Sequence, residues 1–245
     1  MDESEKPILT PEALVCALTH RHQKELSLKK RAIITIDRLS LKFLREKTGA
    51  KLNKFWDPYR IIYEIPRKNT ILTRSIPSGP MLAALVEEIS RFGSEEIIFF
   101  GLCGSIMDDL NIGEVIIAKG AIRDEGTSFQ YLKNDYPIVL SNWFEYWAPI
   151  VEKKGFIPGT VWTTDGLYRE TKKKVEKFTS KGACGVEMEV ASFYAVCKYL
   201  NVKGIAFLLV SDMFRNGQWI PGFDSTEFKV GSEKILNFLA EESVL

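Results

Sequence analysis

Acidic side chains occur in the sequence at the ends of two apolar runs. Glu187 and Glu189 lie one residue apart in the segment GVEMEV, ahead of a helical pattern, and Asp212 follows the run GIAFLLVS directly. We expect one of these two acids to anchor the fold while the other faces a cleft. An acid at the carboxyl end of an inner strand lies where α/β sheets bind ligands. These carboxylates are therefore candidates for binding a polar or cationic group in a pocket.

Two further segments end in residues that suit a pocket. The segment 159–168, GTVWTTDGLY, ends in hydroxyls, an acid and aromatic rings, and the segment 99–106, FFGLCGSI, ends in a glycine turn. A simpler interpretation exists for each acid, because the glutamates can be exposed residues at a helix start and Asp212 can be a helix cap. Since several strand ends carry such residues together, we favour one shared pocket.

Apolar runs and helical patterns alternate along the chain, as in an α/β domain whose helices cover a mixed sheet. Strands are expected at 32–36, 61–65, 70–74, 96–100, 114–118, 160–163 and 205–210, and helices at 39–47, 80–92, 143–154, 170–180, 190–200 and 227–242. The sequence TPE at 10–12 predicts a further helix to about Leu26. We expect an N-terminal helical extension over 1–30 and a single domain over 31–245, a three-layer αβα sandwich around the sheet.

The composition excludes several classes of function. The 245 residues include 33 Lys and Arg against 32 Asp and Glu, a net charge of +1, so neither nucleic acid nor a membrane surface is expected as partner. The start MDESEKPILT lacks the apolar run of a secretory signal, and no run reaches the roughly 18 residues of a membrane span. The four cysteines have no C-x-x-C spacing. We therefore expect reduced thiols, no metal site and a cytoplasmic location.

The sequence resembles the nucleoside phosphorylase and nucleosidase superfamily, which contains purine nucleoside and uridine phosphorylases, methylthioadenosine nucleosidase and AMP nucleosidase. The likeness covers about residues 32–239. It rests on SIPSGP at 75–80, FFGLCGSI at 99–106, IGEVIIAKGAIRDEGTS at 112–128, TTDGLY at 163–168, GVEME at 185–189 and VSD at 210–212. GVEME followed about twenty residues later by VSD is the most specific part of this pattern.

The resemblance implies cleavage of a nucleoside at its N-glycosidic bond, through a ribosyl group that carries positive charge. Glu189 would bind the ribose hydroxyls, Met188 would lie beneath the sugar, and Asp212 would donate to or bond a ring nitrogen of the base. Glu189 and Asp212 are thus the expected catalytic residues. The expected substrate-binding residues are Cys103, Gly104, Leu167, Tyr168, Val186, Glu187, Met188 and Ser211.

The resemblance also favours a purine-type base, because the glutamine and arginine that hold uracil in uridine phosphorylases would fall near Thr171 and Lys173 here. Trp219, in the segment QWIPGF, is a candidate to close over the pocket. Members of the superfamily are homo-oligomers, so we expect a dimer or hexamer. The aromatic segments 129–136 and 143–147 supply candidate contact surface.

The acceptor of the ribosyl group is the open question. The positions that hold phosphate in phosphorylases carry Ser40, Phe99 and Leu102 here, and an anion without guanidinium partners is costly to bury. Candidate replacements are Arg38, Arg74 and Arg123, with Arg60 as a further one.

We expect phosphorolysis in purine salvage, giving free base and ribose 1-phosphate, with phosphate as co-substrate and no cofactor. The alternatives are a phosphate-independent nucleosidase, acting on a nucleoside, AMP or a methylthioadenosine-like substrate, and a non-catalytic nucleoside-binding protein.

Overall fold

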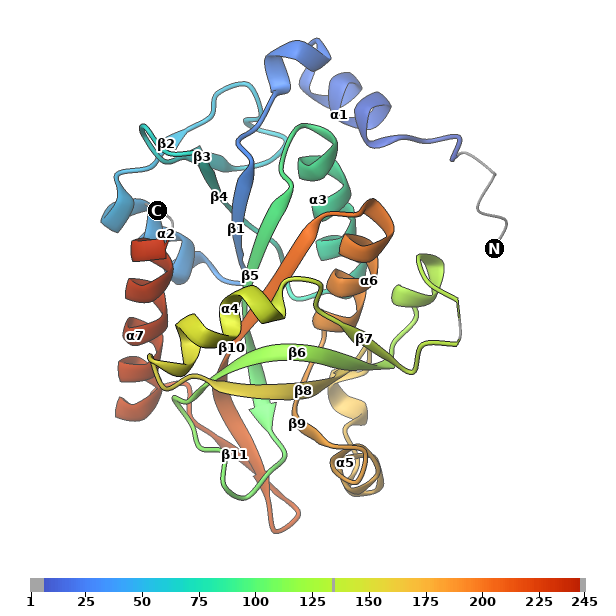
Figure 1. Ribbon diagram of the computed structural model, residues 1–245, viewed down its shortest axis with the longest axis vertical. Helices are drawn as coiled ribbons and strands as arrows, with labels where there is room; N and C mark the ends of the chain where they lie inside the picture. The colour runs from blue at the N-terminus through green and yellow to red at the C-terminus, as the bar shows by residue number, and fades with distance from the viewer. Residues whose placement is uncertain (1–6, 134, 243–245) are drawn as a thin grey trace.

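A mixed β-sheet forms the centre of the fold, with helices on both of its faces (Figure 1). The computed structural model describes residues 7–133 and 135–242. Within them the strands follow the order β11-β10-β6-β8-β9-β5-β1-β4-β3-β2, with β7 paired to β6. The predicted fold class, a single α/β domain around a mixed sheet, is confirmed.

The elements have the following bounds. The strands are β1 (Arg31–Thr35), β2 (Lys51–Leu52), β3 (Ile62–Glu64), β4 (Thr70–Arg74), β5 (Glu96–Ser105), β6 (Val115–Asp124), β7 (Ile138–Leu140), β8 (Ile157–Thr164), β9 (Ala183–Glu187), β10 (Lys203–Arg215) and β11 (Gln218–Pro221). The α-helices are α1 (Pro11–Thr19), α2 (Arg38–Thr48), α3 (Gly79–Arg91), α4 (Phe144–Glu152), α5 (Lys172–Thr179), α6 (Val190–Leu200) and α7 (Thr226–Glu242). The 3₁₀ helices are η1 (Gln23–Leu26), η2 (Ser128–Gln130) and η3 (Leu167–Arg169). Among the helices that the structure describes, none has the length and apolar character to cross a membrane.

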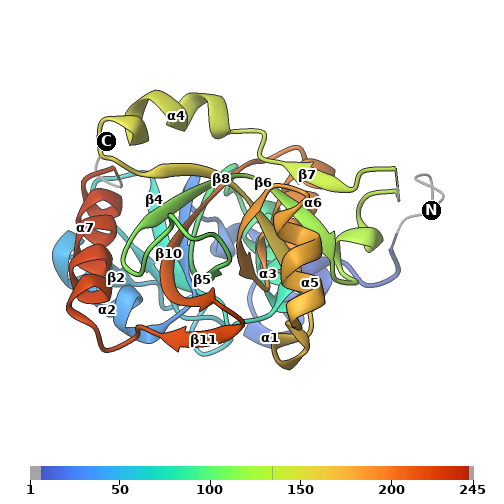
Figure 2. The same ribbon diagram turned by 90° about the horizontal axis from the view of Figure 1, so that it is seen from below.

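Successive residues of the central strands alternate between two cores. Ile34 and Phe99 belong to the core that α3 and α6 cover, whereas Ile33 and Ile98 belong to the core that α2, α4 and α7 cover. Figure 2 shows α2 and α7 on one side of the sheet and α3 and α6 on the other. Because both faces are buried, the central strands read in the sequence as continuous apolar runs.

Part of the sheet closes into a ring. β5 pairs with β10, β10 with β6, β6 with β8, β8 with β9, and β9 with β5 again. The strands β1, β4, β3 and β2 extend from β5 as an open sheet. The ring was not predicted from the sequence. It brings Gly104 at the end of β5 beside both Val186 of β9 and Asp212 of β10.

The N-terminal helix is shorter than predicted. α1 ends at Thr19, where His20 takes a left-handed conformation with φ of 53°, and the separate turn η1 follows. The prediction of one helix to Leu26 is therefore wrong beyond Thr19. α1 packs on the domain, since Val15 is fully buried and Glu12 forms an ion pair with Arg91 of α3.

Several strands run further than the sequence indicated. β5 continues to Ser105, β6 to Asp124 and β10 to Arg215, so the polar ends of these segments lie within the sheet rather than in loops. The segment of Trp219, for which no strand was expected, is strand β11 and forms an antiparallel hairpin with β10. β2, β7 and β9 were also not among the expected strands.

Candidate active site

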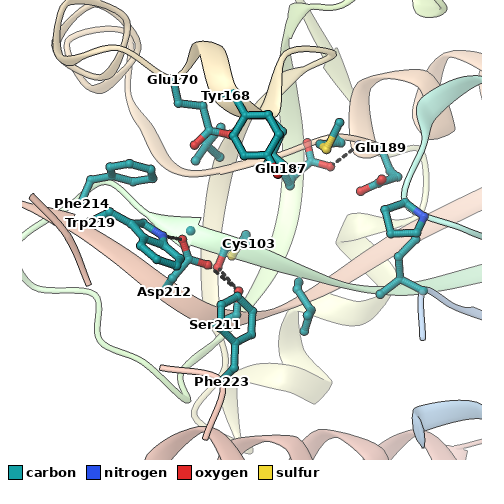
Figure 3. Close-up of a pocket in the computed structure, with 17 residues that line it drawn as sticks. Cys103, Tyr168, Glu170, Glu187, Glu189, Ser211, Asp212, Phe214, Trp219 and Phe223 are labelled. Atoms are coloured by element: carbon teal, nitrogen blue, oxygen red, sulfur yellow. Dashed lines mark hydrogen bonds between the residues drawn. The ribbon is translucent and has the colours of Figure 1, made fainter. Parts of the chain in front are cut away.

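A pocket of about 630 Å³ opens where the carboxyl ends of the central strands meet (Figure 3). It is lined by Ile36, Pro77, Leu102, Cys103, Gly104, Leu167, Tyr168, Glu170, Val186, Glu187, Met188, Glu189, Ser211, Asp212, Phe214, Trp219 and Phe223. The structure thus brings together all the residues that the sequence analysis assigned to catalysis or to substrate binding, together with Trp219.

Glu187 fixes the turn between β9 and α6. Its Oε2 accepts hydrogen bonds from the backbone N–H groups of Glu189 (2.6 Å) and Val190 (2.7 Å), and its Oε1 accepts one from the Thr163 hydroxyl. Thr163 Oγ1 accepts a bond from the N–H of Ala191 (2.9 Å). The first N–H groups of a helix have no partner inside the helix, so these bonds satisfy them. Of the two glutamates, Glu187 is the one that anchors the fold.

Glu189 is buried beside the pocket with an unsatisfied oxygen. The residue is 4% exposed, and among the described residues its Oε1 has no hydrogen-bond partner. Burial and the nearby Glu187 carboxyl raise the pKa of Glu189, although bonds from the backbone of Met188 and Ser78 lower it. An unpaired buried oxygen is costly, so a ligand that offers hydroxyl hydrogens or positive charge would stabilise it.

The EGTS segment positions α6 from behind the pocket. The buried Glu125 accepts hydrogen bonds from the N–H (2.9 Å) and the hydroxyl of Ser128, and from the hydroxyl of Ser192 in α6 (2.8 Å). Ser192 also packs against Gly79, where an added Cβ would lie 2.6 Å from its Oγ. EGTS and SIPSGP therefore hold the helix that follows Glu189, and of these two segments only Pro77 lines the pocket.

Asp212 lies at a bulge of β10, and both of its oxygens accept hydrogen bonds. The register with β5 shifts between Val210 and Asp212. Trp219 Nε1 donates to Asp212 Oδ2 (2.8 Å), and Ser211 Oγ donates to Oδ1 (2.7 Å). An added Cβ at Gly104 would lie 2.9 Å from Oδ2. Gly104 lies within strand β5 and leaves room for this carboxyl, so the glycine turn expected in FFGLCGSI is wrong.

Glu170, immediately after η3, is the main lining residue that sequence reasoning missed. Burial is the largest cause of its shift, with the charge of Asp212 next, and together they raise the pKa of Glu170 to about 7. It was expected only as the first residue of a helix, and its place two residues after TTDGLY was the available signal. Ile36, Pro77, Phe214 and Phe223 also line the pocket without having been singled out.

Arg123 does not reach the pocket. The residue is 8% exposed, and its guanidinium Nε donates a hydrogen bond to Ser128 Oγ (2.7 Å). It also donates to three backbone carbonyls of the following loop, those of Leu132 (2.9 Å), Lys133 (2.8 Å) and Tyr136 (2.9 Å). This corrects the expected phosphate role of Arg123, because its donors are already used in holding this loop.

The other candidate arginines also stay outside the pocket lining. Arg60 is paired with the buried Glu88 (2.8 Å). Arg38 is exposed at the first residue of α2, and Arg74 ends β4, with its Nη1 donating to the carbonyl of Ser75 (3.3 Å). Arg38 and Arg74 do lie at the carboxyl ends of adjacent strands, because β1 and β4 pair in parallel.

The positions at which the resemblance led us to expect phosphate binding are apolar or already bonded. Leu102 lines the pocket, and Phe99 is fully buried in the core. Ser40 is buried, and its hydroxyl donates to Asp37 Oδ2 (2.5 Å), which caps α2. Both carboxyl oxygens of Asp37 thus accept hydrogen bonds from Ser40 at the start of α2.

The lining is strongly acidic. It contains Glu170, Glu187, Glu189 and Asp212, and over the described residues it contains no Lys, Arg or His. Such a pocket can stabilise positive charge in a bound molecule, and it opposes a bound dianion. The apolar side chains around the acids exclude water, which strengthens these electrostatic effects.

Several known proteins are similar to this chain in sequence. The model of the Phosphorylase superfamily matches residues 30–234. The DeoD-type purine nucleoside phosphorylase of Buchnera aphidicola is 29% identical over 185 residues, 73% of this chain and 76% of that protein. An uncharacterized protein of Acanthamoeba polyphaga mimivirus is 29% identical over 147 residues, 58% of this chain but only 56% of that protein.

Solved structures show the same fold at low identity. The uridine phosphorylase of Vibrio fischeri has a TM-score of 0.74 and 19% identity, covering 90% of this chain and 93% of that one. The AMP nucleosidase of Bacteroides thetaiotaomicron has a TM-score of 0.71 and 21% identity, and the match covers 95% of this chain and 96% of that one. With the family match over most of its length, the chain belongs to the Phosphorylase superfamily.

Proposed function

We propose that this protein hydrolyses the N-glycosidic bond of a purine-type nucleoside, releasing free base and ribose. The observation that carries the proposal is the acidic lining, with Glu170, Glu187, Glu189 and Asp212 and no basic side chain among the described residues. Membership in a family of nucleoside-cleaving enzymes supports the bond that is cleaved. The charge of the pocket supports water, rather than the phosphate expected from the sequence, as the acceptor.

Glu189 suits the sugar end of such a substrate. Its free Oε1 can accept hydrogen bonds from ribose hydroxyls, and the half-buried Met188 beside it offers an apolar surface to the sugar. Cleavage of a glycosidic bond builds positive charge on the ribose ring. A carboxylate held close to that charge stabilises the transition state more than the ground state. Substrate hydroxyls that bond to Glu189 would also favour its ionised form.

Asp212 suits the base end. It lies among Phe214, Trp219 and Phe223, whose rings offer apolar surface to a planar base. A fixed carboxylate can accept a hydrogen bond from a ring N–H and so orient the base in the pocket. The purine preference is supported by the similarity to a purine nucleoside phosphorylase. Thr171 and Lys173, where uridine phosphorylases would hold uracil, do not line the pocket.

Phosphate as acceptor would need cations, and the described residues of the lining include none. A charge-assisted hydrogen bond contributes about 1.5–3 kcal/mol, so losing two weakens anion binding by about 3–6 kcal/mol, on the order of 10²–10⁴ in Kd. Repulsion by the pocket carboxylates adds to this cost. Water carries no charge, so it needs no cationic partner and is not repelled by the carboxylates.

Phosphorolysis is the second candidate. It is favoured by Arg38 and Arg74, which stand at the carboxyl ends of the paired strands β1 and β4, the edge of the sheet that carries the pocket residues Ile36 and Pro77. Alanine at both arginines separates the candidates, because it should abolish a phosphate-dependent activity and leave hydrolysis unchanged.

The identity of the sugar product tests the proposal. In phosphate-free buffer we expect a purine nucleoside to give free base and ribose, followed by absorbance and by mass spectrometry. Added phosphate should leave the rate unchanged, because the lining residues that the structure describes include no cation to hold it. Cleavage that strictly requires phosphate and yields ribose 1-phosphate would contradict hydrolysis.

Replacement of Glu189 tests the sugar end. Glu189→Gln removes the charge beside the ribose and should lower kcat/KM by about 30- to 1,000-fold for every nucleoside, corresponding to about 2–4 kcal/mol. Glu233→Gln, at an exposed position of α7, is the matched control and should behave as the parent chain. Parent-level kcat/KM in a folded Glu189→Gln chain would remove Glu189 from the mechanism.

We further propose that the chain forms a homo-oligomer whose contact covers the pocket mouth. At this mouth Tyr168 is 94% exposed and Trp219 is 55% exposed, a large apolar surface for an isolated chain. Trp143 and Trp147, first considered as contact surface, are buried in the core. Sedimentation should give a dimer or hexamer at micromolar concentration, whereas a stable monomer would contradict this assembly.

A further inference from the structure

A two-residue turn fixes how the strand of Trp219 pairs with the strand of Asp212. Asn216 and Gly217, which join β10 to β11, both have positive φ, 52° and 72°. An Asn-Gly pair of this kind is typical of the tightest β-hairpins, in which the loop length sets the register of the two strands. Trp219 therefore lies opposite Phe214. Since side chains two residues apart point to the same face of a strand, Trp219 is the diagonal neighbour of Asp212.

The hairpin is held at both of its ends. Near the turn, Nη2 of Arg215 donates a hydrogen bond to the carbonyl of Asp108 (2.7 Å). Beyond β11, the N–H of Gly222 donates to the carbonyl of Ser211 (2.9 Å). The strand β11 is exposed along its whole length, so these bonds and the pairing with β10 fix the place of Trp219.

The indole of Trp219 holds one oxygen of the Asp212 carboxyl. Its Nε1 donates to Asp212 Oδ2 (2.8 Å), the bond drawn between the two side chains in Figure 3. On β5, an added Cβ at Gly104 would lie only 2.9 Å from the same oxygen. Oδ2 thus lies between the indole N–H and the backbone of β5. An indole carries one N–H and no acceptor, so this bond uses its whole hydrogen-bonding capacity.

The Ser211 hydroxyl does not fix the other oxygen in the same way. Ser211 Oγ lies within hydrogen-bond distance of both Asp212 Oδ1 (2.7 Å) and the carbonyl of Cys103 (3.2 Å). A hydroxyl has one hydrogen, so it donates to only one of these acceptors at a time. When it donates to Cys103, Oδ1 is left to accept a hydrogen bond from a bound base. Trp219 is therefore the donor that fixes the carboxyl, and Oδ1 is the oxygen available to a ligand.

We propose that Trp219 is a positioning residue, which sets the orientation of the Asp212 carboxyl and thereby the recognition of the base. The inference rests on the proposed function, in which Asp212 accepts a hydrogen bond from a ring N–H of the base. Without the indole N–H the carboxyl is free to turn, and its bond to the base weakens. The indole ring also lines the pocket, so loss of the N–H has to be separated from loss of the ring.

Trp219→Phe removes the N–H and keeps an aromatic ring. It should lower kcat/KM on inosine, whose base carries a ring N–H, by about 10-fold or more, the usual effect of losing a hydrogen bond to a charged group. On 4-nitrophenyl riboside, whose leaving group has no N–H, the same variant should stay near the parent value. Ile220→Val, at the next position of β11 and outside the pocket lining, is the control and should match the parent on both substrates.

A double-mutant cycle measures whether Trp219 acts through Asp212. In an Asp212→Ala chain, Trp219→Phe should have no further effect on kcat/KM for inosine, because the acceptor of the indole N–H is gone. The same cycle on the affinity for hypoxanthine, measured by calorimetry, requires no cleavage. Trp219→Phe should weaken hypoxanthine binding about 10-fold when Asp212 is present and leave it unchanged when Asp212 is replaced.

The outcomes separate this inference from the proposed function. If the parent chain cleaves neither substrate but the hypoxanthine cycle behaves as expected, the proposed reaction is wrong and the positioning role stands. A parent chain that neither cleaves inosine nor binds hypoxanthine overturns both. In chains that melt at the parent temperature, parent-level activity of Trp219→Phe on inosine, equal losses on the two substrates, or equal losses with and without Asp212 would each overturn the positioning role alone.

Discussion

The carboxylate of Glu187 is the constraint on which the site depends. By accepting the N–H groups of Glu189 and Val190, it ends β9 and begins α6 within two residues. That turn leaves the Glu189 side chain against the pocket with one oxygen free. The surrounding network of Thr163, Glu125 and Ser192 serves to hold the turn and the helix in place. Glu187, whose carboxyl oxygens are both hydrogen-bonded, thus positions Glu189, whose Oε1 has no partner among the described residues.

The concentration of acids has an energetic consequence. Burial raises the pKa values of Glu170, Glu187 and Glu189. Buried carboxyls close to one another therefore keep their protons to a higher pH than exposed ones, which reduces the repulsion between them in the empty pocket. A substrate that develops positive charge reverses this balance, because it favours the ionised carboxylates most in the transition state. A phosphate anion would meet the opposite field. The same charges therefore account for the proposed bond cleavage and for the proposed choice of water.

Sequence reasoning found the parts of the molecule that depend on local patterns. α6 and β4 were predicted with the observed bounds, and the motifs GVEME and VSD located Glu189 and Asp212. Closure of the sheet through β9 and β5 could not be predicted, because it depends on pairs far apart in the chain. For the same reason Glu170 was missed, since only the fold sets it opposite Asp212. Arg123 looked like an anion ligand by residue type alone, but its loop uses its donors.

In the proposed function, the pocket stabilises a ribosyl cation without help from phosphate. The most direct measurement is calorimetric binding of an iminoribitol, a ribose analogue with a protonated ring nitrogen, compared with its uncharged counterpart, each in the presence and absence of phosphate. We predict that the cationic analogue binds much more tightly than the uncharged one and that phosphate does not change its affinity. Equal affinity for the two analogues, or tight binding of the cation only when phosphate is present, would contradict it.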